Sequence, residues 1–109
     1  MLDKYLLKYD GIESAVGNLT IDIEGDLFEF EPIPGYDGPL PFFLKSPNSP
    51  LSTSEKLKMW VLDRAPEPEY ELIDMLIEKA GLKEYDAYGF FKYNGGKFNT
   101  DKFYVEVMA

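Results

Sequence analysis

Trp60-x-x-x-Arg64-x-Pro66-x-Pro68 opens the stretch that decides the fold, and an alternating strand pattern at residues 102–107 closes it. The residue before a proline avoids the helical region, so Pro66 predicts the end of one helix. A proline also suits the first turn of a helix, so Pro68 predicts the start of a second helix. We therefore expect two helices joined by a short break and followed, further along, by a C-terminal strand.

Local signals define the ends of these two helices, which together span residues 53–80. Ser52 and Glu55 have the spacing of a capping box, in which each side chain binds the backbone N–H of the other residue. The second helix is expected to stop at Gly81, because glycine suits the left-handed conformation of a helix end. A further short helical turn is expected at residues 86–91. Apolar faces are formed by Leu57, Trp60 and Val61 in the first helix and by Ile73, Leu76, Ile77 and Ala80 in the second.

The first third of the chain is predicted to form strands within residues 4–31. Apolar and polar side chains alternate there, as is typical of a strand with one face in water, and the apolar positions are Leu19, Ile21 and Ile23. Gly25-Asp26 predicts a tight turn into a second strand, on which Phe28 and Phe30 share a face. This pattern indicates a β-hairpin.

Residues 32–50 form a loop rich in proline and glycine that contains the apolar run Leu40-Pro41-Phe42-Phe43-Leu44. Two adjacent Phe side chains indicate that the loop packs over the core as an ordered wrap instead of linking two domains. Phe42 and Phe43 are candidates for an exposed contact with a partner, and core filling is the competing interpretation. Together these elements predict a single α+β domain over residues 1–109, with a small, mostly antiparallel sheet and two helices packed on one face.

The composition narrows the possible functions of the chain. It has 20 acidic and 11 basic residues and a formal net charge of −9, which argues against direct binding to nucleic-acid phosphates. It contains no His and no Cys, so the usual proton shuttles, thiol nucleophiles and thiolate zinc ligands are missing. We therefore expect a protein that is not an enzyme and has no cofactor or metal. No apolar run has the length of a membrane span, so we expect a cytoplasmic protein without membrane contact.

Acidic residues gather in two runs. The first holds six acids and no base: Asp22, Glu24, Asp26, Glu29, Glu31 and Asp37. The second, at residues 63–78, holds six acids against Arg64 alone. If the runs lay side by side, they would form one negative surface, which could occupy a nucleic-acid channel on another protein or only keep the domain soluble. The candidate partner-binding acids are Asp22, Glu24, Glu29 and Glu31.

Arg64 follows Trp60 by one helical turn and has two candidate roles. Its guanidinium could satisfy carbonyl groups at the helix end, or it could pair with Asp101. Asp101 is also expected to cap the turn that enters the last strand. Trp60 is expected in the core, as is usual for a lone Trp on the apolar face of a helix.

The same stretch resembles the small N-terminal segment that precedes HipA-like kinase domains in some bacterial proteins. The pattern there is roughly Trp-x-x-x-Arg-x-Ile-Pro, then a helix ending in Leu-Gly-Leu or Leu-Gly-Ile, then Asp-x-Tyr/Phe-Trp. The similarity covers about half of the chain, and the matched positions are Trp60, Arg64, Pro66, Asp101, Phe103 and Tyr104. The chain departs from the pattern with Ala65 before the proline, Tyr70 near a position often held by Arg, and Phe-Tyr for the Tyr-Trp pair.

The resemblance implies a standalone accessory module that binds or restrains a HipA-like kinase, as an antitoxin does. It carries over no kinase activity, because the ATP-binding and catalytic residues of that family have no counterpart here, and the matched positions are expected chiefly to define the fold. We therefore predict a non-catalytic protein-interaction module. The alternative is an acidic inhibitor from a phage or mobile element that mimics nucleic acid and binds a basic nucleic-acid-binding protein. Neither hypothesis specifies the oligomeric state.

Overall fold

A computed structural model describes residues 2–45 and 50–108 of the chain. Within these residues the chain forms one α+β domain with a four-stranded antiparallel sheet and three α-helices, which confirms the predicted fold class. Residues 46–49 of the predicted wrap, and residues 1 and 109 of the predicted domain, lie outside the described residues.

The sheet has the strand order β3-β2-β1-β4, and every neighbouring pair is antiparallel. Its strands are β1 (Asp3–Tyr9), β2 (Gly17–Asp22), β3 (Leu27–Pro32) and β4 (Phe103–Val107). The predicted hairpin is formed by β2 and β3, in which Leu19 faces Phe30 and Ile21 faces Phe28 on the buried side. Ile23 differs from the prediction, because it lies in the turn and is 42% exposed. The alternation of side chains therefore predicted the strand but not the position of its last residue.

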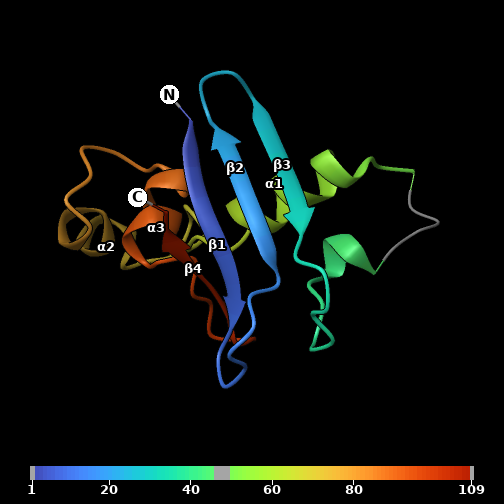
Figure 1. The fold of residues 1–109 in the computed structure, drawn as a ribbon. Coiled ribbons are helices and arrows are strands. Elements are labelled where there is room, and N and C mark those ends of the chain that lie inside the picture. The colour runs from blue at the N-terminus through green and yellow to red at the C-terminus, as the bar shows by residue number, and fades with distance from the viewer. Residues whose placement is uncertain (1, 46–49, 109) are drawn as a thin grey trace.

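Three α-helices and a short 3-10 turn complete the fold. They are η1 (Phe42–Leu44), α1 (Thr53–Leu62), α2 (Ile73–Lys79) and α3 (Ala87–Tyr93). Helix α1 passes behind the sheet, and α2 lies beyond the edge of the sheet that is opposite β3 (Figure 1). The predicted capping box is present, since the Glu55 N–H donates to Ser52 Oγ at 3.1 Å and the Ser52 N–H donates to Glu55 Oε1 at 3.3 Å. None of the described helices is long and apolar enough to cross a membrane.

The prediction for the second helix was partly wrong. Helix α2 begins at Ile73 instead of near Pro68, and none of its residues is buried. The second helix against the core is α3, which contributes buried Tyr88 and Phe91. Helical periodicity shows which side chains share a face, but tertiary packing decides whether that face is covered.

The core lies between the inner face of the sheet and helices α1 and α3. Trp60 on α1 is near its centre, with ring centroids 5.5 Å from Phe43, 6.5 Å from Phe91 and 6.2 Å from Phe103. The Phe91 and Phe103 rings pack edge to face with Trp60, and the Phe43 ring is tilted against it by 60°, which favours a single arrangement. The core therefore holds the C-terminal end of α1 in a fixed position, and the candidate site is built there.

Candidate functional site

Arg64 is the polar centre of the site. Its guanidinium donates from Nη1 to Asp101 Oδ2 at 2.8 Å and from Nη2 to Asp101 Oδ1 at 2.7 Å. It also donates from Nε to the Gly96 carbonyl at 2.6 Å and from Nη2 to the Phe103 carbonyl at 3.0 Å. Of the two roles considered for Arg64, the pair with Asp101 is present. The carbonyls that Arg64 binds do not belong to the end of α1 but to the turn before β4 and to β4 itself. The residue is 5% exposed, so these bonds satisfy a charge that is almost fully removed from water.

Asp101 has the capping role predicted for it. Its Oδ1 accepts the Phe103 N–H at 3.0 Å, which fixes the entry into β4. Burial favours the neutral acid and raises the pKa of Asp101. The hydrogen bonds from Arg64 and from the Phe103 N–H, together with the charge of Arg64, outweigh burial and lower this pKa below its ordinary value of 3.8. Asp101 is therefore an ionised, acceptor-only group that holds Arg64 in one orientation.

The positions that carry the family resemblance converge on this pair. The Arg64 guanidinium carbon lies 4.2 Å from the centroid of the Trp60 ring, and Trp60 and Phe103 are both buried. Pro66 borders a shallow hollow together with Arg64, and Tyr104 borders another hollow beside Asp101. Contacts among Trp60, Arg64, Asp101 and Phe103 therefore join α1 and the residues after it to the start of β4.

A hollow of about 260 Å³ opens beside Arg64, and we call it the Phe42 pocket. Its rim is apolar, with exposed fractions of 38% for Leu40, 43% for Phe42 and 37% for Phe98. Its remaining lining residues are Pro41, Trp60, Asp63, Arg64, Thr100, Asp101 and Phe103. The pocket therefore combines an apolar rim with a paired, hydrogen-bonded polar wall.

Of the two Phe residues proposed as exposed contacts, only Phe42 lies at the surface. Phe43 is 1% exposed and packs against Phe30 and Trp60, so its assignment as a partner contact was wrong and core filling is its role. The two residues are neighbours in a 3-10 turn, where successive side chains point in different directions. A Pro-rich loop has no regular period from which these directions could be predicted.

The other two members of the rim do not follow from the sequence pattern. Leu40 belongs to the apolar run, in which no period distinguishes surface from core positions, and Phe98 lies outside the predicted helices and strands. The signal for Phe98 is its position between Lys97 and Asn99, because a large apolar side chain among polar residues outside the helices and strands is a candidate for a surface contact.

The acids proposed for partner binding lie on the β2–β3 hairpin. Glu24 is exposed in the turn, and Glu29 and Glu31 are exposed along β3, while Asp22 at the end of β2 is only half-exposed. The other acidic run lies around α2, and the strands β1 and β2 separate it from β3 (Figure 1). Glu24 borders one hollow together with Ala80, the residue that follows α2, but no acid of residues 63–78 lines this hollow. They do not lie side by side along their lengths, so the condition for one continuous negative surface is not met.

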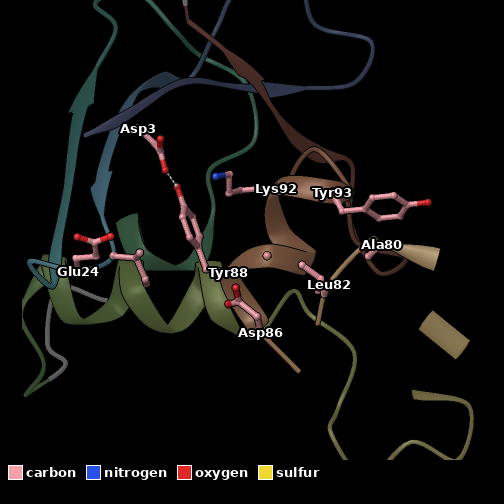
Figure 2. A pocket seen from close by; sticks show the side chains of 10 residues that line it. Asp3, Glu24, Ala80, Leu82, Asp86, Tyr88, Lys92 and Tyr93 are labelled. Carbon is pink, nitrogen blue, oxygen red and sulfur yellow. Dashed lines mark hydrogen bonds between the residues drawn. The ribbon is translucent and has the colours of Figure 1, made fainter. Parts of the chain in front are cut away.

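That hollow, of about 560 Å³, is larger and more polar than the Phe42 pocket. The Tyr88 hydroxyl donates to Asp3 Oδ2 at 2.6 Å and lies 2.7 Å from the Tyr5 hydroxyl. Asp3, Glu24 and Asp86 lie on different sides of the hollow (Figure 2). Among residues 2–45 and 50–108, no group of three or more acidic side chains is placed to hold a metal ion.

The chemistry of these two hollows differs. The larger one presents separated, solvent-facing carboxylates, and the Phe42 pocket presents apolar side chains over a rigid ion pair. Comparisons of the chain with protein-family models, curated proteins and solved structures each return no match. Function is therefore inferred from the sequence and from the residues of the site.

Proposed function

We propose that this domain is a non-catalytic protein-interaction module that binds its partner at the Phe42 pocket. The observation that carries the proposal is the convergence of Leu40, Phe42 and Phe98, from two separate segments, on the rim of one hollow. Each of these side chains keeps more than a third of its surface in water. Covering them removes apolar area from water, which is the main source of binding free energy at interface centres.

The size of the pocket indicates what it accepts. A volume of about 260 Å³ lies below the range of about 300–1,000 Å³ typical of small-molecule sites. It suits one anchoring side chain of a protein partner, such as an aromatic or a large aliphatic residue. The Arg64–Asp101 pair stiffens one wall before the partner arrives, which lowers the entropy lost on binding.

The resemblance of the Trp60–Tyr104 stretch supports a HipA-like kinase as the partner, with this domain acting in the manner of an antitoxin. The alternative, an acidic inhibitor that mimics nucleic acid, is supported by the net charge of −9 and by exposed Glu29 and Glu31. Strand register weighs against this alternative, because Glu29, Thr20 and Lys4 form one row across the sheet. The charge of Lys4, two strands from Glu29, weakens the continuous negative field that a mimic needs.

Affinity capture from the source organism, quantified by mass spectrometry, tests the proposal. We expect the wild-type protein to capture a partner. The amount of partner captured should fall at least about tenfold with Phe42→Ala and with Phe98→Ala, because each variant removes an apolar anchor. Tyr93→Ala is the matched control, since Tyr93 is 51% exposed but lies on α3 outside the pocket. Thermal unfolding of every variant establishes that the loss is not caused by unfolding.

Salt distinguishes the two hypotheses. Capture through the Phe42 pocket should persist as salt is raised, whereas capture by a nucleic-acid mimic should fall steeply and should disappear in Glu29→Lys/Glu31→Lys. Capture that survives Phe42→Ala and Phe98→Ala together would contradict the pocket as the binding site. Repeated capture of partners that never include a HipA-like kinase would exclude this class of partner. It would leave the proposal that the domain is a protein-interaction module.

A further inference from the structure

Helix α2 exposes apolar side chains that the domain itself does not cover. No residue of α2 is buried, and the exposed fractions are 46% for Tyr70, 45% for Leu72 and 56% for Met75. Leu72 and Met75 are three positions apart, so they lie on one side of the helix, and Tyr70 is in the turn just before it. We call these three residues the Met75 face.

Another side of α2 faces the segment that directly follows the helix. Ile73 and Ile77 border a hollow together with Leu82 and Tyr85. The Tyr85 hydroxyl donates to the Pro66 carbonyl at 2.7 Å, which ties together the two ends of the segment that carries α2. The segment is therefore anchored on one side and presents the Met75 face outward.

The charges around the Met75 face define what can cover it. Residues 67–79 contain five acids, Glu67, Glu69, Glu71, Asp74 and Glu78, and one base, Lys79. All five acids are exposed. Such a field repels nucleic acid and anionic membranes and attracts a basic protein surface. An apolar strip bordered by acids is complementary to a helix with an apolar strip bordered by Lys and Arg.

We propose that α2 is a docking element for a basic amphipathic helix of a protein partner. The apolar strip of that helix would cover Tyr70, Leu72 and Met75. Its basic side chains would pair with Glu71, Asp74 and Glu78, which follow one another along one side of α2. The Met75 face shares no lining residue with the Phe42 pocket. The two surfaces can therefore be tested separately, and this inference does not depend on the function proposed for the pocket.

The test uses a synthetic, fluorescently labelled peptide made of Leu and Lys, with Leu at positions i, i+3, i+4 and i+7. A scrambled peptide of the same composition spreads the Leu residues around the helix. Fluorescence anisotropy is measured at low and at physiological salt. We expect saturable binding of the amphipathic peptide, weakened about tenfold or more by Leu72→Ser/Met75→Ser and by Glu71→Lys/Asp74→Lys. The scrambled peptide should bind more weakly.

The matched control is Glu29→Lys/Glu31→Lys, which changes the net charge by the same amount as Glu71→Lys/Asp74→Lys but on β3. Equal weakening in this control would show nonspecific attraction and would overturn the proposal. Absence of binding, or equal binding of the two peptides, would also overturn it. Phe42→Ala should leave peptide binding unchanged, so failure here is distinguishable from failure of the Phe42 pocket. Circular dichroism of each variant verifies the fold.

Discussion

Arg64 and Asp101, 37 residues apart in sequence, are joined by two parallel hydrogen bonds of 2.8 and 2.7 Å. The pair connects the end of α1 to the entry of β4. Arg64 also binds the Gly96 and Phe103 carbonyls, so one side chain fastens a helix, a turn and a strand.

Arg64→Ala should destabilise the domain by about 3 kcal/mol or more, because it leaves Asp101 and two carbonyls without their donor. Arg64→Lys should recover only part of this loss, since an ammonium cannot reproduce the planar, two-pronged geometry. Urea unfolding of the two variants and of the wild type measures the differences in free energy of unfolding. An Arg64→Lys variant as stable as the wild type would contradict the importance of the paired geometry.

Acid should weaken the same contact. The pKa of Asp101 is lowered in the folded state, whereas an unfolded Asp titrates near about 3.9. The unfolded chain therefore binds a proton at Asp101 before the folded chain does, as the pH falls. The stabilisation from ionised Asp101 is complete above about pH 5 and is lost as the pH falls through the lowered pKa.

Asp101→Asn isolates this contribution, because the amide keeps the shape of the side chain but carries no charge. The difference in unfolding free energy between wild type and Asp101→Asn should be constant from neutral pH to about pH 5 and should shrink at lower pH. Urea unfolding at a series of pH values measures it. A difference that stays constant down to about pH 2 would mean that Asp101 titrates normally.

The parts of the fold that depend on neighbouring residues were predictable from the sequence. The β2–β3 hairpin follows from period-two alternation and a turn, and the start of α1 follows from the Ser52–Glu55 pair. The Arg64–Asp101 pair was one of two options, because the sequence supplied the charges but not the distance between them. Local rules therefore sufficed wherever both partners lie within a few residues.

Features that depend on long-range packing were not predictable in the same way. The apolar stripe of α2 has the same period as that of α1, yet only α1 is buried, because the space behind the sheet is filled by α1 and α3. Phe42 and Phe43 have identical chemistry and opposite environments. Phe98 borders the Phe42 pocket, and the turn before β4 that carries Phe98 is bound by Arg64 through the Gly96 carbonyl. Each outcome is decided by a contact distant in sequence.

The capping box gives a prediction about α1 alone. Ser52→Ala should cost about 1 kcal/mol of unfolding free energy, because the Glu55 N–H loses its acceptor at the first turn. Ser14→Ala is the matched control, since Ser14 is exposed and lies in a loop between β1 and β2. The two variants are compared by urea unfolding. Equal stability of Ser52→Ala and Ser14→Ala would show that the cap contributes nothing measurable.

Tyr88 should make the domain sensitive to alkali. Burial and the hydrogen bonds with Asp3 and Tyr5 raise the pKa of Tyr88 above its ordinary value of 10.0. An unfolded chain therefore loses the Tyr88 proton at about pH 10, while the folded chain keeps it. The stabilisation is fully present below about pH 10 and is lost as the pH rises towards the raised pKa.

Tyr88→Phe should cost about 1 kcal/mol at neutral pH, because it removes the hydrogen bonds to Asp3 and Tyr5. Above about pH 10 the difference from the wild type should narrow, since the variant has no hydroxyl at this position to ionise. Tyr93→Phe is the matched control for the loss of a tyrosine hydroxyl, since Tyr93 is exposed on α3. Circular dichroism follows unfolding while ultraviolet absorbance follows tyrosinate formation. If the gap for Tyr88→Phe stayed constant with pH, folding would not raise the pKa of Tyr88, and the contact that joins α3 to β1 would be weaker than the 2.6 Å bond to Asp3 implies.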